Sequence, residues 1–168
     1  MVNQIILASK SKVRKDILEK NQIKCFVEPS NVDEDSVKDS LLKENATPEI
    51  ISKNLAELKA NKISQKKTGE LVLGADSVID LNGKIISKPT DRREALEILQ
   101  SLNGQTHDLI SSVCISLNGS MIWNYTDIQN IKKEVEDAKK TFAKYKWPTI
   151  DVTRKSVEET AEIGRAHV

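Results

Sequence analysis

The sequence has almost no net charge and no long apolar segment. Its 168 residues carry a formal charge of +1 at pH 7, so no overall field favours nucleic acid or an anionic membrane as a partner. Apolar residues 5–8 are too few for the hydrophobic region of a signal peptide, and nothing approaches a membrane span. We therefore expect a cytoplasmic protein, long enough for one domain with a core, that binds neither nucleic acid nor membrane.

Cysteine is scarce, and one common nucleotide-binding motif is missing. Cys25 and Cys114 are far apart and lie in apolar, strand-like segments, which favours buried thiols over a disulfide or a metal site. No Gly-x-x-x-x-Gly-Lys-Ser/Thr segment occurs. The absence of this phosphate-binding loop argues against kinase chemistry.

Residues 71–89 are the segment around which we interpret the rest. The apolar run at 71–73 predicts a buried strand, with Asp76 at its end. Asn82-Gly83 predicts a hairpin because both residues tolerate a positive φ, and Lys88 follows the hairpin. A carboxylate and an ammonium brought together suit a metal-bound polyphosphate. A solvated aspartate at a strand end and a turn lysine explain the same spacing.

The beginning of the chain predicts a strand, a serine-rich loop and a helix. Gln4 to Ala8 is the expected strand, and Ser9, Ser11 and Arg14 follow it. Unpaired N–H groups at a helix N-terminus favour phosphate, and Arg14 could add a bidentate grip. An ordinary N-cap at Ser11 with Arg14 in solvent is the alternative.

Two further segments precede residue 71. The acidic residues 31–35 are either a loop beside a metal or base, or a solvated turn. Thr47-Pro48 predicts the start of a helix, with Ile51, Leu55 and Leu58 on one apolar face. Lys53 and Lys59 are most simply the charged surface of that helix.

After the hairpin, helices and strands alternate. Asp91 and Glu94 form a predicted capping box for a helix that turns Leu96 and Leu99 inward. His107 precedes a strand, and Asn118-Gly119 predicts a second hairpin whose return strand is 121–125.

From Asp127 the spacing changes to that of a long amphipathic helix, followed by a strand at 149–152 and a helix from Ser156. The fold class expected is α/β: a mixed twisted sheet with flanking helices, followed by a helix–strand–helix tail.

Six short segments share a recognisable order. They are Leu7-Ala8-Ser9-Lys10-Ser11 with Arg14, Val32-Asp33-Glu34, Leu55 to Ala60, Gly74-Ala75-Asp76-Ser77, Ser87-Lys88-Pro89 and Leu102 to His107. With them, residues 1 to about 125 resemble the Maf family of nucleoside triphosphate pyrophosphatases. The fold implied is Maf/ITPase-like, and truncated, because Gly-Ala-Tyr, Gln-Gly and Gly-Leu-Pro segments typical of that family's second half do not follow.

The resemblance implies hydrolysis of a nucleoside triphosphate to the monophosphate and pyrophosphate with a divalent cation, Mg²⁺ or Mn²⁺, and it is compatible with a homodimer. The catalytic residues implied are Asp76, Lys88 and Glu34. Asp76 and Glu34 are also the implied metal ligands. Substrate-binding residues implied are Ser9, Ser11, Arg14, Lys59 and Ser77. Val13 and Ser77 depart from the second arginine and the threonine usual in dTTP/UTP-directed members, and they also differ from the methylated-nucleotide branch.

The remainder of the chain resembles something else. Residues from about 125 to 161 resemble the C-terminus of the bifunctional kinase/pyrophosphorylase family that regulates phosphoenolpyruvate synthase, most closely from Trp147 to Ala161. Residues 162–168 resemble a translated sequencing adapter. The domains expected are therefore 1–125, 126–161 and an artefactual tail, 162–168. Two alternatives to the hydrolase stay open: a non-catalytic nucleotide-binding module or inactive chimera, and a fragment of that regulatory protein.

Overall fold

The computed structural model describes residues 4–131 and Lys144. The chain divides into two units, Met1–Lys132 and Lys133–Val168, and the first contains the continuous described range, 4–131. Its elements are β1 (Ile5–Leu7), α1 (Lys12–Lys20), β2 (Cys25–Val27), α2 (Glu34–Lys43), α3 (Pro48–Ser64), β3 (Val72–Leu81), β4 (Lys84–Ile86), α4 (Arg92–Leu102), β5 (His107–Leu117) and β6 (Ser120–Ile131).

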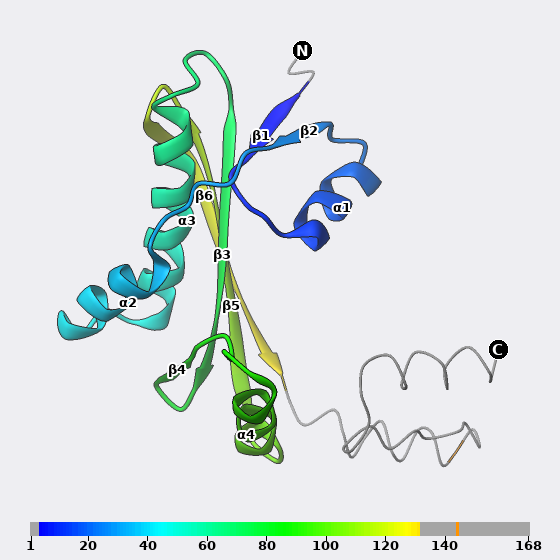
Figure 1. The fold of residues 1–168 in the computed structure, drawn as a ribbon, viewed down its shortest axis with the longest axis vertical. Coiled ribbons are helices and arrows are strands. Elements are labelled where there is room, and N and C mark those ends of the chain that lie inside the picture. The colour runs from blue at the N-terminus through cyan, green and yellow to red at the C-terminus, as the bar shows by residue number, and fades with distance from the viewer. Residues whose placement is uncertain (1–3, 132–143, 145–168) are drawn as a thin grey trace. The chain divides into compact units, whose positions relative to one another are not determined.

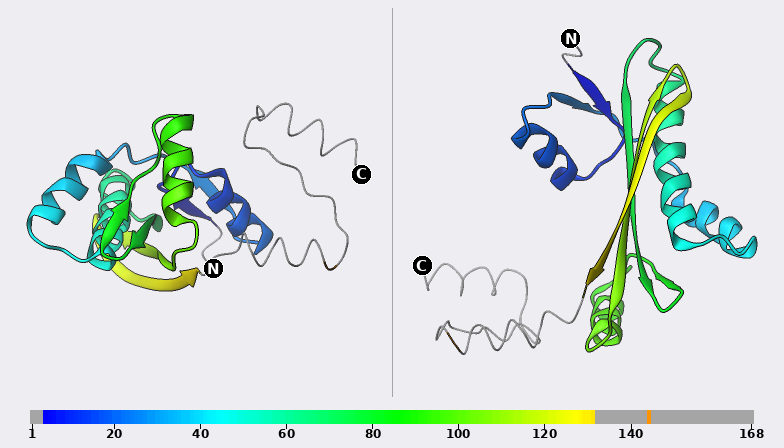
Figure 2. Two further views of the ribbon diagram at one scale, coloured as in Figure 1. Left: turned by 90° about the horizontal axis from the view of Figure 1, so that it is seen from below. Right: turned by 180° about the vertical axis from the view of Figure 1, so that it is seen from behind.

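The strands form one mixed sheet in the order β2-β1-β3-β5-β6, with β4 paired to β3. β1 runs parallel to β2 and β3, whereas β5 runs antiparallel to both of its neighbours, β3 and β6. α3 lies on one side of the long strands and α1 on the other (Figures 1 and 2). The predicted α/β class with a mixed sheet and flanking helices is confirmed.

The difference in length between β1 and β3 opens the sheet at one point. β1 pairs with β3 only at Ile6↔Val72 and Leu7↔Leu73, and the chain then turns into the loop before α1. β3 continues to Leu81. Between Leu73 and Ile79, where β4 begins to pair, the edge of β3 therefore faces a loop and the start of a helix instead of a strand.

Asp76 lies in the middle of β3 and not at a strand end as the sequence predicted. β3 pairs with β5 from Val72↔Ser116 to Asp80↔Asp108, so the strand runs through Gly74-Ala75-Asp76. Glycine, alanine and aspartate are poor strand formers. The apolar run at 71–73 therefore predicted a strand that ends before its true end at Leu81. Pairing with β5 overrides that local preference.

Both predicted hairpins are confirmed. Asn82 and Gly83 have φ of 53° and 84°, and Asn118 and Gly119 have φ of 51° and 83°. Two consecutive positive φ values are those of a type I′ turn, whose twist matches that of the flanking strands.

α3 begins as predicted, with Thr47 as N-cap accepting a hydrogen bond from the Ile50 amide. Two predictions for this helix are wrong. Leu58 is 41% exposed, and Lys59, expected on the charged surface, is only 5% exposed. The reason is the i, i+4 row, which places residue 59 directly after the buried Ile51 and Leu55 and leaves residue 58 beside it.

Two predictions for the later elements are also wrong. Leu96 and Leu99 do not turn inward on α4 but are 41% and 65% exposed, because α4 lies at the end of the long strands (Figure 1). The helix expected from Asp127 is instead strand as far as Ile131, because β6 keeps pairing with β5 to His107↔Ile131. The rest of that helix and the strand and helix predicted after it lie outside the continuous described range, 4–131.

Candidate active site

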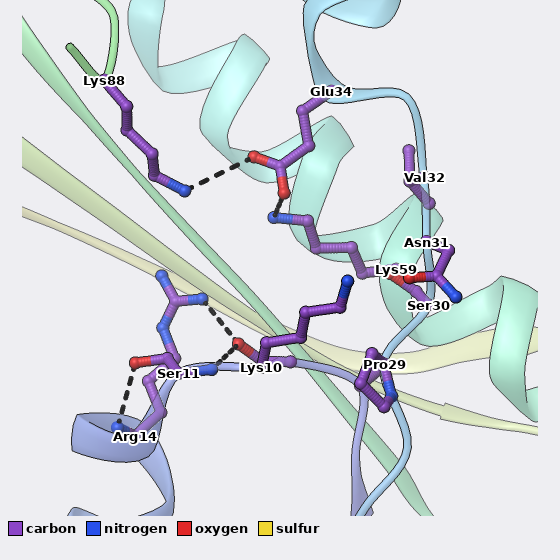
Figure 3. A pocket seen from close by; sticks show the side chains of 12 residues that line it. Lys10, Ser11, Arg14, Pro29, Ser30, Asn31, Val32, Glu34, Lys59 and Lys88 are labelled. Atoms are coloured by element: carbon purple, nitrogen blue, oxygen red, sulfur yellow. Dashed lines mark hydrogen bonds and ion pairs between the residues drawn. The ribbon is translucent and has the colours of Figure 1, made fainter. Parts of the chain in front are cut away.

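A pocket of about 530 Å³ opens where β1 ends. One wall is the loop from β1 into α1, another is the segment at 29–34 between β2 and α2, and the side chains of Lys59 and Lys88 complete the lining (Figure 3). The pocket lies at the carboxyl ends of the parallel strands β1 and β2, which is where open α/β sheets characteristically bind ligands.

The β1–α1 loop is organised by its serines. Ser11 caps α1 by accepting a hydrogen bond from the Arg14 amide at 3.3 Å, so the N-cap interpretation is confirmed. Ser9 Oγ accepts from the Ser11 amide and from Arg14 Nη1, each at 3.2 Å. The loop is therefore tied to the side chain that leaves the first turn of the helix.

Arg14 is not a solvated surface residue. Its Nη1 donates to the carbonyl oxygen of Ala75 at 2.8 Å, and its Nη2 donates to Ser77 Oγ at 3.4 Å. Contacts with both the loop and β3 fix the plane of the guanidinium at the pocket wall. A fixed planar cation of this kind is suited to bidentate contact with phosphate.

The Lys59 ammonium joins two carboxylates. Its Nζ lies 2.6 Å from Asp76 Oδ1 and 2.9 Å from Glu34 Oε1. The Lys59 and Asp76 side chains are almost fully buried, whereas that of Glu34 is 31% exposed. Asp76 does not line the pocket, and Lys59 lies between it and Glu34.

A second ammonium approaches Glu34 from the other side. Lys88 Nζ lies 3.9 Å from Glu34 Oε2, and the Lys88 side chain is 84% exposed (Figure 3). Burial raises the pKa of the Glu34 carboxyl, but the hydrogen bond and charge of Lys59 and the charges of Lys88 and Lys38 outweigh it and hold that pKa below its usual value. Glu34 is therefore an ionised acceptor at neutral pH.

Asp76 and Glu34 fit a divalent cation whose remaining ligands come from a bound phosphate compound and water. Asp76 Oδ2 is buried and has no hydrogen-bond partner among the described residues, so one carboxylate oxygen is free to bind. Within residues 4–131 no group of three or more histidine, cysteine or acidic side chains clusters as a complete metal site. Mg²⁺ is commonly held by one or two carboxylates together with substrate phosphates, and Asp76 and Glu34 provide that number.

The structure brings most of the predicted residues together. Ser9, Ser11, Arg14, Glu34, Lys59 and Lys88 line one pocket. Asp76 binds Lys59 behind it, and Ser77 binds Arg14 beside it. With Lys10 also in the lining, cationic side chains outnumber acidic ones, as a polyanionic ligand requires.

Sequence reasoning missed Ser30 as part of the lining, whereas Asn31 belongs to the segment 31–35 that was predicted either beside a metal or base or as a solvated turn. Ser30 is buried, and Asn31 adopts a φ of 48° while its carbonyl accepts from Lys62 Nζ at 2.8 Å. Asparagine tolerates a positive φ, so a turn after β2 was the available signal. His107 does not line this pocket.

None of the helices in the described part of the chain is both long and apolar enough to cross a bilayer.

Relatives with curated names share most of the described sequence. The chain is 80% identical over 127 residues to a nucleoside triphosphate pyrophosphatase of Pelagibacter ubique, a match that covers 76% of this chain and 65% of that protein. It is 38% identical over 139 residues to a nucleoside triphosphate pyrophosphatase of Roseobacter denitrificans, covering 82% and 70%. A 7-methyl-GTP pyrophosphatase of Brucella abortus is 34% identical over 138 residues, covering 82% and 69%.

A solved structure of a HAM1 protein from Coxiella burnetii aligns over 77% of this chain and 72% of its own, with a TM-score of 0.47 and 14% identity. At the family level, the Maf-like protein model matches residues 4–164. The sequence segments around the pocket and this match agree, and the chain belongs to the Maf-like protein family.

Proposed function

We propose that this chain hydrolyses a nucleoside triphosphate to the nucleoside monophosphate and pyrophosphate. The single observation that carries the proposal is the Lys59 ammonium held by Asp76 and Glu34 at the wall of a cation-lined pocket. The relatives named nucleoside triphosphate pyrophosphatases support it. Because the match spans 65% of the Pelagibacter protein, the proposal concerns the part of the machinery that this chain contains.

The cationic side chains bind and orient the triphosphate. Arg14, already fixed by Ser9 and Ala75, would contact phosphate oxygens with the edge of its guanidinium that faces the pocket. The Lys88 side chain is 84% exposed, and its ammonium on a four-carbon stem can stay close to the phosphate as negative charge develops on it. Ser9 and Ser11 add hydroxyl groups at the start of α1, where backbone N–H groups also favour anions.

A carboxylate accepts the proton of the attacking water. As the water oxygen bonds to the α-phosphorus, its proton passes to a carboxylate, and the bond from the α-phosphorus to the bridging oxygen breaks to release pyrophosphate. Asp76 is the catalytic carboxylate, as base or metal ligand, because its Oδ2 has no partner among the described residues, and Glu34 is the second acid. When bound, Mg²⁺ or Mn²⁺ held by Asp76 and Glu34 supplies charge screening for the phosphate oxygens and acidifies water.

Ser77 and Val13 bear on the base. Ser77 contacts Arg14 and shares a 3.0 Å hydrogen bond with Ser111 on β5, whereas Val13 is 67% exposed on α1. Neither residue matches the pattern of dTTP/UTP-directed members, so a preference for those bases is not part of the proposal. A 7-methylated guanine nucleotide belongs in the panel because one relative bears that name.

The test is release of pyrophosphate from a panel of nucleoside triphosphates, with and without Mg²⁺ or Mn²⁺. Asp76→Asn should reduce the rate by about 100-fold or more. The matched control is Asp80→Asn, on the same strand, where the carboxylate accepts from the Gly83 amide in the hairpin turn. Metal-dependent release lost only in Asp76→Asn supports the proposal. Nucleotide binding without turnover in the wild type would instead identify a binding module.

The proposal includes a cellular location, an oligomeric state and a set of excluded partners. A cytoplasmic location, a homodimer, and the absence of nucleic acid or membrane partners stay predictions from composition and resemblance. Size-exclusion chromatography with light scattering would measure the oligomeric state of the purified chain.

The segment after Tyr125 comes either from a chimeric gene or from a continuous natural one. The similarity of Trp147 to Ala161 to another family supports a chimeric gene. Two observations favour continuity: the boundary after residue 125 falls inside β6, which pairs with β5 through Ile131, and the family match extends to residue 164. Sequencing source DNA across the codons for Trp123 to Ile128 separates the two origins.

A further inference from the structure

We propose that Lys59 is an internal counter-ion that occupies the cation position between Asp76 and Glu34 until a metal–nucleotide complex displaces it. The inference rests on the proposed function and adds to it a coupling: the divalent cation and the nucleotide bind together. In the protein without ligands, Lys59 lies within 2.6 Å of Asp76 and 2.9 Å of Glu34. These are the two carboxylates that fit a divalent cation.

The position of Lys59 is set by packing of its helix. Ala56 and Ala60, on either side of it along α3, are fully buried against Gly74 of β3. The backbone of residue 59 therefore has little freedom to withdraw from Asp76. A lysine ammonium sits on a flexible four-carbon stem, so the charge can move while the helix stays in place.

Two cations cannot share this position. Buried like charges at a few ångströms repel strongly because little water screens them. A divalent cation bound to Asp76 and Glu34 would lie next to the Lys59 ammonium if Lys59 did not move. Conversely, without any cation the two carboxylates would face each other with Asp76 almost fully buried. The Lys59 ammonium and the divalent cation therefore compete to neutralise the same two carboxylates.

The pocket offers Lys59 a second position only when a polyanion is bound. Lys59 is part of the lining. Among the other charged residues of the lining, Lys10, Arg14 and Lys88 are cations, and Glu34 is the one anion, which Lys59 already contacts. Phosphate oxygens in the pocket would supply the anion that Lys59 exchanges for its carboxylates. Because one ligand then removes the obstacle to the other, binding of each strengthens binding of the other.

The experiment measures Mn²⁺ binding to the protein without nucleotide, by electron paramagnetic resonance of free Mn²⁺. Lys59→Met keeps the length of the side chain and removes its charge. We expect it to bind Mn²⁺ at least about tenfold more tightly than the wild type. Lys53→Met removes the same charge from an exposed position of the same helix and should bind as the wild type does. Lys59→Arg keeps a cation in place and should show no gain.

A second measurement covers the case in which Lys59→Met is too unstable to bind metal at low concentration. Thermal unfolding is followed with and without excess Mn²⁺, and the cation should raise the midpoint of Lys59→Met more than that of the wild type. The gain in affinity should disappear in Lys59→Met/Asp76→Asn. Equal or weaker Mn²⁺ binding by Lys59→Met, together with an equal midpoint shift, would overturn the counter-ion.

Adding nucleotide tests the coupling between the two ligands. A non-hydrolysable triphosphate analogue should tighten Mn²⁺ binding to the wild type more than to Lys59→Met, because only the wild type has an ammonium to displace. Equal tightening in both overturns the coupling. Pyrophosphate release by the wild type is measured separately, so its absence would refute the proposed hydrolysis without altering the metal-affinity comparison.

Discussion

Gly74 of β3 lies so close to Ala56 of α3 that no side chain fits between them. A Cβ atom at residue 74 would lie 2.2 Å from the Ala56 carbonyl oxygen and 2.7 Å from the Ala60 amide nitrogen. Both neighbouring atoms belong to the backbone of a helix, so neither can rotate away. This contact brings α3 against β3 at the level where Lys59 meets Asp76.

Gly74→Ala should therefore damage the site as well as the fold. Moving α3 away from β3 should cost about 1–3 kcal/mol of unfolding free energy and reduce kcat by about tenfold or more, because the Lys59–Asp76 geometry changes. Urea unfolding and pyrophosphate release measure the two effects. Val72→Ala, a core truncation on the same strand, is the control for stability alone. A Gly74→Ala protein as active as Val72→Ala would contradict the prediction.

Arg14→Lys should raise KM for the nucleotide by about tenfold. Lysine keeps the charge, but its single nitrogen cannot replace both Nη1, which contacts Ser9 and Ala75, and Nη2, which contacts Ser77. Initial-rate kinetics over a range of nucleotide concentrations measure the change. Lys15→Ala alters the same helix at a partly exposed residue that forms an ion pair with Glu19, and its KM should be that of the wild type.

Lys88→Met should lower the hydrolysis rate and leave stability within about 0.5 kcal/mol of the wild type. The Lys88 side chain is 84% exposed and its nearest carboxylate oxygen is 3.9 Å away, so the ion pair contributes little to folding. Chemical unfolding and kinetics on one preparation test both halves. Lys84→Met, at an exposed lysine of the preceding hairpin, should change neither. Marked destabilisation by Lys88→Met would show that it is a structural residue.

Glu34 gives the stability a dependence on pH. The charges of Lys59 and Lys88 hold its pKa in the folded protein below 4.5, its ordinary value, despite partial burial. A depressed pKa stabilises the fold above the unfolded value, and this contribution is lost as pH falls through the folded pKa.

The difference in unfolding free energy between wild type and Glu34→Gln should consequently be constant near neutral pH and shrink below about pH 4.5. Urea titrations at several pH values measure it. Glu19→Gln, in an exposed i, i+4 pair with Lys15, is the comparison. A difference that grows as pH falls would show that the sign of the shift is wrong.

The features that local chemistry controls were predictable. Asn82-Gly83 and Asn118-Gly119 adopt the positive φ values expected of them, and Ser11 and Thr47 cap their helices through hydrogen bonds within four residues. In each case the interacting groups are neighbours in the sequence. Local patterns offered Asp76, Lys88 and Arg14 as phosphate-site candidates beside plainer alternatives, and the resemblance to the Maf family favoured the site interpretation.

Features that depend on distant partners were not predictable in the same way. The helical spacing after Asp127 gave way to pairing with β5, since eleven aligned partners outweigh a weak local preference. Leu96 and Leu99 show helical spacing, but the fold places no core beside them, and they remain exposed. Amphipathic spacing indicates which residues share a face and not what that face meets.

From sequence alone came the turns, the caps, the mixed α/β class and a set of chemically suitable side chains. Tertiary structure alone decided that Asp76 is buried in the middle of a strand, that Lys59 is its partner, and that Arg14 is fixed to β3. The physical reason is separation along the chain: Lys59 and Asp76 are 17 positions apart, and Arg14 and Ala75 are 61 apart. Electrostatic interactions between such residues depend on distance and burial, and only the packed sheet and helices set those quantities.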